Sequence, residues 1–451
     1  REAIDLANSN AAPDTITFDL DPGNQTISID GAILTILEDD TTIDGHIDGG
    51  DNVTLSYSGV QTRTSGLRIR SSGNVIQNLT IREFTGHGIY IQSYSSGNSY
   101  TANDNLISST VVVSSAFYGF YVYQDPNGGS VDGNRILLSQ AVGNRYGVVV
   151  QGASDSEVLT NVIGLDAAGM VAWPNKLDGL LLRGAISATV RGNILSGNGR
   201  YGVYVIEGAS GNRIVGNHIG VDASGTSARP NAEDGITLEG AVNTTIRDNT
   251  ISGNERNGIL ITGGTVGSVI AGNRIGVNAS GVGSVPNGTG YDRDGIQCSG
   301  GGGHDNVIGG TDPADANIIS GNTRAGIFLD GYACYSNEIY GNYIGTNLAG
   351  ADLGNGSLAY SGDQGDAGIQ IEDGAHGNVI GGVASGQPNV IRFNLHGVRF
   401  SGYNSPPQSN RLVGNTIVGS DLDGVVNQLT HRNTFSTTGT LGNLFAATGT
   451  L

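Results

Sequence analysis

A four-residue unit recurs along the chain: a glycine, an apolar residue, a residue of variable type and a second apolar residue. In an extended chain, residues two apart point to the same side, so the two apolar positions share one face of a short strand. The variable position then lies on the opposite, exterior face. Full copies begin at Gly88, Gly119, Gly147, Gly179, Gly202, Gly235, Gly258, Gly295, Gly326, Gly368 and Gly397, and Gly424 begins a degenerate one.

The spacing of these copies indicates the length of one coil of a solenoid. The shortest interval is 23 residues, from Gly179 to Gly202 and again from Gly235 to Gly258. Gly179 and Gly235 are 56 residues apart, as are Gly202 and Gly258, which indicates that a two-coil unit has been duplicated. A repeat of this length made of three short strands is typical of a parallel β-helix.

A second recurring unit is asparagine, any residue, then isoleucine or leucine, as at Asn134, Asn217, Asn273 and Asn342. Asparagine favours turns because its short side chain bonds to nearby main chain and tolerates left-handed backbone. Because these residues return once or twice in every coil, we expect their side chains to stack as a ladder from coil to coil.

Four longer segments interrupt the repeat at matching points. They run over 163–179, 219–235, 275–295 and 344–368, and the first two are alike in sequence. We expect these loops to leave the helix at the same edge on alternate coils and to form one wall of a surface groove.

The sequence therefore predicts an all-β fold, a right-handed parallel β-helix solenoid over residues 13–430. Residues 1–12 are expected to form a cap, because Arg1–Asn10 carries Ala3, Ile4 and Leu6 without a turn residue before Asn8. This short helix would cover the open end of the first coil. Residues 431–451 form a tail that either folds back as a second cap or docks on another copy of the chain, giving a filament.

Composition and charge narrow the partners. Glycine supplies 75 of 451 residues but without a three-residue period, so collagen is excluded. Lys+Arg number 22 against 41 Asp+Glu, for a formal net charge of −19, which argues against nucleic acid and anionic membrane surfaces. No apolar run of membrane-spanning length occurs, so no membrane insertion is expected. Cys298 and Cys334 lie at different points of their coils, which disfavours a disulfide.

The clearest candidate chemistry lies at the coil edge just before the repeated glycine. Asp178, Asp234 and Asp294 immediately precede it, and on intervening coils Arg200 and Arg256 lie two residues before it. One interpretation is a solvated ladder of ion pairs that avoids stacking like charges. The other is a saccharide groove in which arginines hold carboxylates and an aspartate acts as acid or base.

The inserted loops carry a second set of acids. Asp166 and Asp222 hold matching positions, where Asn278 and Asn347 stand in the later loops. Carboxylates among loop carbonyls suit calcium, but no calcium-loop motif is present, so solvated loop acids are the alternative. Otherwise no cofactor is indicated.

Tyrosines gather early in the chain, and Tyr90 and Tyr121 hold the same exterior position on consecutive coils, with Tyr123 close by. One interpretation is a binding surface, either a stacking platform for sugar rings or a protein contact. The alternative is an aromatic stack that only stabilises the sheet.

The coil motifs over roughly residues 60–430 resemble the pectate-lyase-like β-helix superfamily, and Arg1-Glu2-Ala3 resembles the N-terminal module of secreted bacterial proteins named for a Cys-Ser-Leu-Arg-Glu-Ala start. The superfamily includes lyases, hydrolases, epimerases, adhesins and phage spikes, so the resemblance implies fold more than activity. Gly86-His87-Gly88 also resembles a short polygalacturonase motif, but the paired aspartates of that family are not recognisable nearby, so the favoured interpretation of His87 is a turn residue at a coil edge.

Two functions remain open. The first is an extracellular or cell-surface structural or adhesive protein, whose partner is a carbohydrate or another copy of itself. The second is a polysaccharide-active enzyme, a lyase or a glycosidase, that uses the loop-walled groove.

Overall fold

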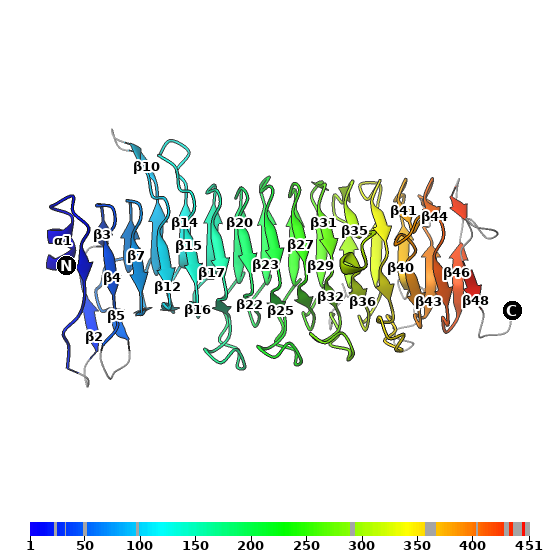
Figure 1. Cartoon of the computed structure of the whole chain (residues 1–451), viewed down its shortest axis with the longest axis horizontal. Helices are drawn as coiled ribbons and strands as arrows, with labels where there is room; N and C mark the ends of the chain where they lie inside the picture. Colours follow the sequence, from blue (N-terminus) through cyan, green and yellow to red (C-terminus); the bar gives the residue numbers. More distant parts are fainter. Residues whose placement is uncertain are drawn as a thin grey trace. The chain divides into compact units, whose positions relative to one another are not determined.

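The computed structural model describes residues 1–21, 25–31, 33–47, 52–95, 99–288, 294–356, 367–402, 405–427, 433–435 and 444–446. The chain forms two compact units, Arg1–Val203 and Tyr204–Leu451. Within each unit, every coil contributes one strand in turn to each of three parallel sheets, here called sheets A, B and C (Figure 1). The predicted all-β parallel solenoid is confirmed.

In unit 1, strands of successive coils pair in parallel. Sheet A contains β1 (Thr15–Ile16), β4 (Thr42–Asp44), β7 (Val75–Gln77), β12 (Leu106–Ser108), β15 (Arg135–Leu137), β18 (Glu157–Leu159) and β21 (Thr189–Arg191). Sheet B contains β2 (Thr26–Ile29), β5 (Val53–Tyr57), β8 (Leu79–Arg82), β13 (Val111–Val113), β16 (Gln140–Val142), β19 (Val162–Ile163) and β22 (Ile194–Leu195). Sheet C contains β3 (Leu34–Ile36), β6 (Leu67–Ile69), β9 (Ile89–Gln92), β14 (Tyr118–Tyr123), β17 (Tyr146–Gln151) and β20 (Leu180–Arg183). A short antiparallel pair joins β10 (Tyr94–Ser95) and β11 (Ser99–Tyr100).

Unit 2 repeats this plan. Sheet A contains β24 (Arg213–Val215), β27 (Thr245–Arg247), β31 (Val269–Ala271), β35 (Val307–Gly309), β38 (Glu338–Tyr340), β41 (Val379–Ile380), β44 (Arg411–Leu412) and β47 (Thr434–Phe435). Sheet B contains β25 (His218–Ile219), β28 (Thr250–Ile251), β32 (Arg274–Ile275), β36 (Ile318–Ile319), β39 (Tyr343–Ile344), β42 (Val390–Arg392), β45 (Thr416–Val418) and β48 (Leu444–Ala446). Sheet C contains β26 (Ile236–Glu239), β29 (Ile259–Thr262), β33 (Ile296–Cys298), β37 (Ile327–Asp330), β40 (Ala367–Glu372), β43 (His396–Phe400) and β46 (Asp423–Asn427). The remaining elements are β23 (Val203–Ile206), the parallel pair β30 (Thr265–Val266) and β34 (Gly303–His304), and the 3₁₀ turn η1 (Pro313–Asp315).

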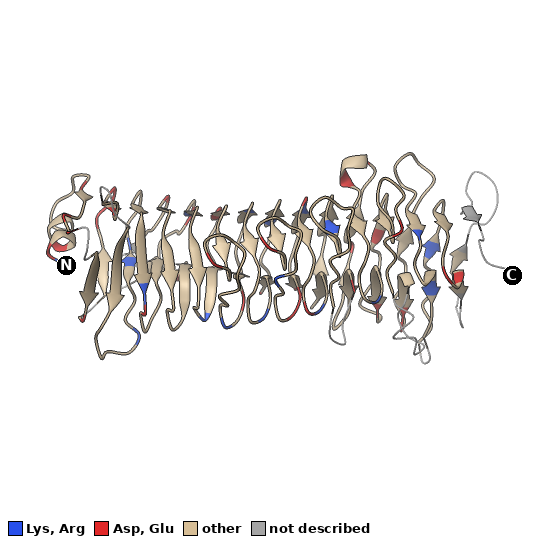
Figure 2. Ribbon diagram, turned by 90° about the horizontal axis from the view of Figure 1, so that it is seen from below, with Lys and Arg blue, Asp and Glu red and all other residues tan. Residues whose placement is uncertain are grey.

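The interior follows the repeated sequence unit. In β29, Ile259 and Ile261 are 0% and 2% exposed, whereas Leu260 between them lies on the exterior. Ile259 pairs with Ile296 of the next coil, so like residues stack on like. Burial of each such apolar side chain stabilises the fold by about 1.5–3 kcal/mol. The charged residues, by contrast, lie mainly on turns and loops (Figure 2).

The repeated glycine is required by the approach of neighbouring coils. A Cβ atom added at Gly119 would lie 2.6 Å from the carbonyl oxygen of Gly147 and 2.9 Å from the Asn144 amide. No side chain fits there without moving main chain, because real Cβ atoms do not approach other atoms so closely. The glycine therefore marks the point where each coil turns into sheet C.

The asparagine ladder is confirmed, and the described residues form three such ladders, one at each corner of the coil. In unit 2 one ladder joins each side-chain amide to the next side-chain oxygen at 2.8–3.0 Å. Its members are Asn217, Asn249, Asn273, Asn317, Asn342, Asn389 and Asn415. The same side chains bond main-chain groups of the adjacent coils, so buried turn backbone is satisfied.

The expected N-terminal helix is confirmed as α1 (Glu2–Ala7). Ile4 and Ala7 are buried, and Ile4 helps to close an apolar cavity of about 70 Å³ lined by the interior residues of the first coils. Asn8, which ends the helix, donates to the carbonyl of Thr35 and accepts from the N–H of Leu37, both at 2.8 Å. The helix is thus fixed to β3 and covers the open coil.

The expectation that Cys298 and Cys334 stay unpaired is wrong. They form a disulfide with their Cα atoms 6.1 Å apart, and both are buried. Its distance along the sequence from the coil glycine predicted that Cys334 lies on a later edge of the coil than Cys298. A tight turn after β37, closed by the Cys334 N–H to the Gly331 carbonyl at 3.0 Å, instead returns its side chain to the interior beside β33.

The predicted C-terminal tail lies mostly outside the described residues. Of residues 431–451, β47 joins sheet A and β48 joins sheet B. Whether the tail caps its own coil or docks on another copy remains a prediction. In the described part of the chain, no helix has the length and apolar character needed to cross a bilayer.

Candidate functional site

The exterior of sheet C in unit 1 carries a stack of tyrosines. Tyr90 of β9 pairs in register with Tyr121 of β14, and their rings are 4.8 Å apart at an angle of 10°. Tyr123 lies against Tyr121 at 5.4 Å. The structure therefore brings together the three tyrosines that the sequence singled out, and we call them the tyrosine platform.

The platform is more buried than an exposed pair of rings. Tyr121 is only 9% exposed, and its hydroxyl donates to Gln151 at 2.9 Å. Burial, with the neighbouring tyrosine hydroxyls, raises the pKa of both Tyr90 and Tyr121. Both hydroxyls therefore stay protonated near neutral pH and can donate hydrogen bonds.

His87 joins the aromatic cluster, a role that its reading as a simple turn residue missed. Its ring lies 4.9 Å from Tyr90, 4.8 Å from Tyr118 and 4.9 Å from Tyr121. Burial lowers the pKa of His87 to about 4, so the imidazole is neutral at pH 7. The available signal was positional, since His87 and Tyr118 both stand immediately before a coil glycine.

A hollow of about 320 Å³ opens beside the platform. It is lined by Arg63, Gly86, His87, Phe117, Tyr118 and Tyr121. Its walls combine aromatic rings with one guanidinium group. Such a lining suits a ligand with an apolar face and polar edges.

The charged coil edge forms ion pairs, but its aspartates are not solvated. In unit 1, Arg200 donates from Nε and Nη2 to the two oxygens of Asp178, both at 2.6 Å. In unit 2, Arg324 holds Asp294 in the same two-pronged manner. Both aspartates are fully buried, so the interpretation as a solvated ladder is wrong for these positions.

Asp234 differs from the other two. It accepts hydrogen bonds from the Asn257 backbone N–H, the Asn257 amide and the Thr237 hydroxyl at 3.0, 2.9 and 3.2 Å. Arg256 lies 3.7 Å from Glu233 instead. Burial raises the pKa of Asp234 to about 6, against the smaller effect of these hydrogen bonds. Its 1% exposure leaves this carboxyl out of contact with a surface ligand.

The inserted loops of unit 2 contact one another, whereas the groove that they were expected to wall remains a prediction. The Ala279 N–H donates to the Gly225 carbonyl at 2.9 Å, and the Asn347 amide donates to the Gly281 carbonyl at 3.0 Å, which links three loops. In unit 1, Asp166 accepts the N–H groups of Met170 and Val171 at 2.7 and 2.9 Å.

The acids of these loops close their own turns. Asp222 accepts from the Ser224 hydroxyl at 2.6 Å and from the Thr226 N–H at 3.2 Å, and Asn278 fills the same place in the next loop. Burial raises the pKa of Asp222, but these hydrogen bonds outweigh it and the net shift is downward. Within the described ranges, no three His, Cys, Asp or Glu side chains are placed to hold a metal ion.

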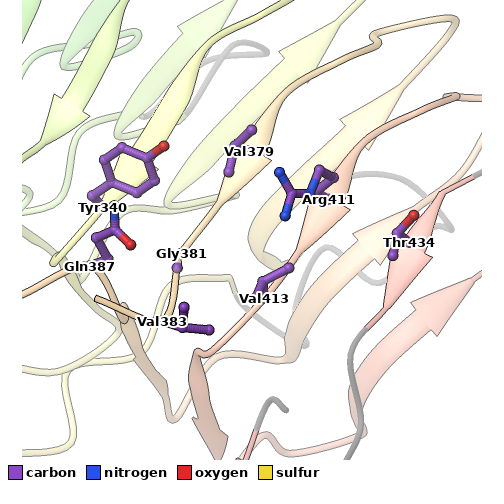
Figure 3. A pocket seen from close by; sticks show the side chains of 9 residues that line it. Tyr340, Val379, Gly381, Val383, Gln387, Arg411, Val413 and Thr434 are labelled. Atoms are coloured by element: carbon purple, nitrogen blue, oxygen red, sulfur yellow. The ribbon is translucent and has the colours of Figure 1, made fainter. Parts of the chain in front are cut away.

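A second hollow, of about 360 Å³, lies on the exterior of sheet A in unit 2 and was missed by sequence reasoning (Figure 3). It is lined by Tyr340, Val379, Gly381, Gly382, Val383, Gln387, Arg411, Val413 and Thr434. Figure 3 shows Arg411 and Thr434 on neighbouring strands. The signal was Gly381, because the coils before and after it carry Tyr340 and Val413 at the matching position.

Three solved structures show a low similarity to this chain. Among solved structures, the mannuronan C-5 epimerase A-module of Azotobacter vinelandii is 14% identical, with 96% of this chain and 94% of that chain covered and a TM-score of 0.45. The periplasmic alginate epimerase AlgG is 14% identical over 91% and 80% of the two chains, with a TM-score of 0.42. The Dettilon tailspike protein is 14% identical, with a TM-score of 0.41. The match covers 81% of this chain but only 58% of the tailspike, less than two thirds of its length.

No curated protein matches the sequence. A family model described as a right-handed β-helix region matches residues 65–231 and 172–437, which is more than half of the chain. The coils and parallel sheets of both units have the arrangement that this description names. The chain therefore belongs to the right-handed β-helix family.

Proposed function

We propose that this chain is an extracellular carbohydrate-binding β-helix protein, and that the tyrosine platform of unit 1 receives the sugar rings. The observation that carries the proposal is the stack of Tyr90, Tyr121 and Tyr123 beside the hollow that contains His87. The stack is continuous with the hollow, because Tyr121 belongs to both.

The physical basis is the shape and chemistry of a pyranose ring. One face of such a ring presents C–H groups that pack on an aromatic face, while its rim of hydroxyls needs hydrogen-bond partners. The Tyr90 and Tyr121 hydroxyls and the Gln151 amide supply such groups. Because these side chains already contact one another, little conformational entropy is lost on binding.

A location outside the cytoplasm agrees with the Cys298–Cys334 disulfide. A buried disulfide between coils persists in oxidising compartments and is rare where cellular thiols keep cysteines reduced. The predicted adhesive role fits the same location, with carbohydrate as the partner.

Catalysis on a polysaccharide is the second candidate, and one observation favours it. His87 lines the hollow, and burial keeps its ring neutral at pH 7. A neutral imidazole in a saccharide hollow is able to accept a proton. Asp178 and Asp294 are unsuited to this role, because each is buried and held by an arginine.

The test is a binding screen of the purified chain against neutral and acidic polysaccharides. We expect Tyr121→Ala to weaken binding by about two- to tenfold, since stacking on an aromatic ring contributes roughly 0.5–1.5 kcal/mol. Tyr332→Ala is the matched control, because Tyr332 is 56% exposed and lies in unit 2. Equal binding by both variants would contradict the proposal.

The same samples separate binding from catalysis. New reducing ends or unsaturated products that disappear in His87→Ala, with polysaccharide binding retained, would establish an enzyme. Binding without any product would leave the adhesive or anchoring role as the function.

A further inference from the structure

Two arginines stand at one end of the tyrosine platform. Arg68 lies in β6 at the exterior position that pairs in register with Tyr90, and Arg70 follows two residues later on the same face. Neighbouring strands are about 4.8 Å apart, so both guanidinium groups are within reach of a ligand that covers Tyr90.

Neutral groups hold both side chains in place. Arg68 donates from Nε and Nη2 to the Thr35 hydroxyl at 3.2 and 2.9 Å. Arg70 lies over the Tyr94 ring at 4.1 Å. The Gln92 side chain is oriented with its amide oxygen toward Arg70. This oxygen accepts hydrogen bonds from Arg70 Nε and Nη2 at 3.2 and 2.9 Å, and the amide nitrogen donates to the Tyr90 hydroxyl at 3.0 Å.

These contacts fix the geometry of the two cations without neutralising them. In the part of the chain that the structure describes, neither Arg68 nor Arg70 forms an ion pair. Arginines elsewhere do, as in Arg82 with Glu83, Arg135 with Glu157 and Arg200 with Asp178. Acidic residues outnumber basic ones by 41 to 22, yet no carboxylate of the described residues pairs with either of these two arginines.

The pair also carries an electrostatic cost. Burial, and then the charge of Arg70, lowers the pKa of Arg68. Like charges near one another repel unless a counter-charge arrives. A ligand that brings an anion removes this repulsion, so part of its binding free energy comes from the protein's own strain.

We propose that Arg68 and Arg70 form an anion subsite at the end of the tyrosine platform, so that unit 1 binds acidic polysaccharide. This inference rests on the proposed function and names its ligand class. A carboxylate or sulfate group on one sugar is held by the guanidinium groups, and the adjoining ring packs on Tyr90. Planar guanidinium groups suit such oxyanions because they donate two parallel hydrogen bonds.

The net charge of −19 does not prevent this binding. Asp125 is one carboxylate that acts on the Tyr90 and Tyr123 hydroxyls, and two guanidinium groups oppose it. At physiological ionic strength the screening length is about 8 Å, so more distant carboxylates contribute little at the subsite. The local pair of cations therefore decides the interaction, which predicts a marked dependence on salt.

The experiment titrates the whole chain with polygalacturonate, dextran sulfate and uncharged dextran at low and high salt. Wild type is expected to bind at least one charged polymer at least tenfold more tightly than dextran. Arg68→Gln and Arg70→Gln should each lose about tenfold in affinity for it, should show a weaker salt dependence and should leave binding of dextran unchanged. Arg82→Gln is the matched control, because Arg82 is already paired with Glu83 at 2.6 Å in sheet B.

Two further measurements separate binding from a structural effect. Arg68→Lys keeps the charge but loses the two parallel hydrogen bonds, so its affinity should lie between those of wild type and Arg68→Gln. Arg68→Gln should unfold at a higher temperature because the repulsion is removed. A preference for polygalacturonate identifies carboxylate as the anion, and a preference for dextran sulfate identifies sulfate.

The failures are distinguishable. If wild type binds dextran as tightly as the charged polymers, the anion subsite is wrong and the carbohydrate site stands. If Tyr121→Ala abolishes binding of acidic polymers while both glutamine variants retain it, the subsite is again wrong. If wild type binds no polysaccharide, the proposed function fails as well.

Discussion

The exterior of sheet C differs between the two units, although the interior behind it does not. In unit 1 the middle positions of consecutive strands are Arg68, Tyr90 and Tyr121. In unit 2 the corresponding positions on three consecutive strands are Thr237, Leu260 and Gln297. The flanking interior positions are buried apolar residues in both units. Coil stacking therefore constrains one face of each strand and leaves the other free to acquire a function.

Burial explains why only one face varies. An interior residue contacts like residues of the coils before and after it, so a change there disturbs two neighbours. An exterior residue contacts neighbours only along the sheet surface, where polar groups remain hydrated. Binding chemistry can thus collect on the exterior of unit 1 without altering the coil.

The largest expected effect on stability comes from a substitution on the interior face of a strand, compared with one on its exterior face. Ile259→Asp places a charge in a dry interior and should lower the free energy of unfolding by several kcal/mol, measured by urea denaturation. Leu260→Asp, one residue away on the exterior, should change it by less than about 1 kcal/mol. Equal losses would mean that the two faces are not distinct.

The disulfide provides the next contrast, because the described cysteines lie only in unit 2. Replacing Cys298 and Cys334 together with alanine should cost about 2–4 kcal/mol, since the bond closes a segment of 36 residues in the unfolded chain. Limited proteolysis followed by mass spectrometry should show earlier cleavage in unit 2 than in unit 1. Earlier cleavage confined to unit 1 would contradict this.

The buried aspartates give an effect that depends on pH. The pKa of Asp234 is raised from 3.8 to about 6, so the folded state prefers the protonated form. Its favourable contribution is complete below pH 3.8 and is lost as the pH rises through 6.

Asp234→Asn should therefore stabilise the protein relative to wild type at pH 7–8, by roughly 2–3 kcal/mol, and much less at pH 4. Asp178→Asn in unit 1 should instead destabilise at neutral pH, because it removes the partner of Arg200. Thermal unfolding of wild type and both variants across pH 4–8 tests these opposite changes in stability. If the unfolding temperatures of both variants followed that of wild type in parallel across this range, the prediction would be wrong.

The smallest expected effect concerns the loops. Asp166→Asn makes the loop of unit 1 like the loop of unit 2 that carries Asn278, and the amide oxygen can still accept the same N–H groups. We expect a change of less than about 1 kcal/mol in the free energy of unfolding and no shift of wild-type unfolding on adding calcium. If calcium raises the free energy of unfolding of wild type but not of Asp166→Asn, the loop binds the ion.

The features that could be predicted from sequence are those that each coil repeats. The alternation at Ile259 and Ile261, the asparagines and the coil glycines recur with the same neighbours, so the pattern carries their environment with it. The capping helix was predictable for a related reason, because an open coil end must be covered and Ile4 supplied the apolar contact.

What the sequence could not give depends on geometry between coils. The turn that brings Cys334 back to Cys298 is one coil's departure from the repeat. The burial of Asp178 and Asp234 depends on how the turns cover the coil edge. The hollow beside Tyr340 depends on glycine positions nearby that have no side chain to fill it. The meeting of Tyr90 with Tyr121 was predictable, whereas the addition of His87 required the curvature of the turn before the glycine.

The asparagine ladders also bear on how the protein ages. An Asn-Gly pair normally deamidates fastest, when the glycine nitrogen attacks the asparagine side-chain carbonyl carbon. At Asn287-Gly288 and Asn355-Gly356 the glycine N–H is bonded to a carbonyl of an earlier coil, at 2.8 and 3.1 Å. Both asparagine amides are fixed by the next coil, at 3.0 Å each. Because both the glycine nitrogen and the asparagine amide are held in hydrogen bonds, we expect the ladders to slow deamidation for as long as the coils stay folded.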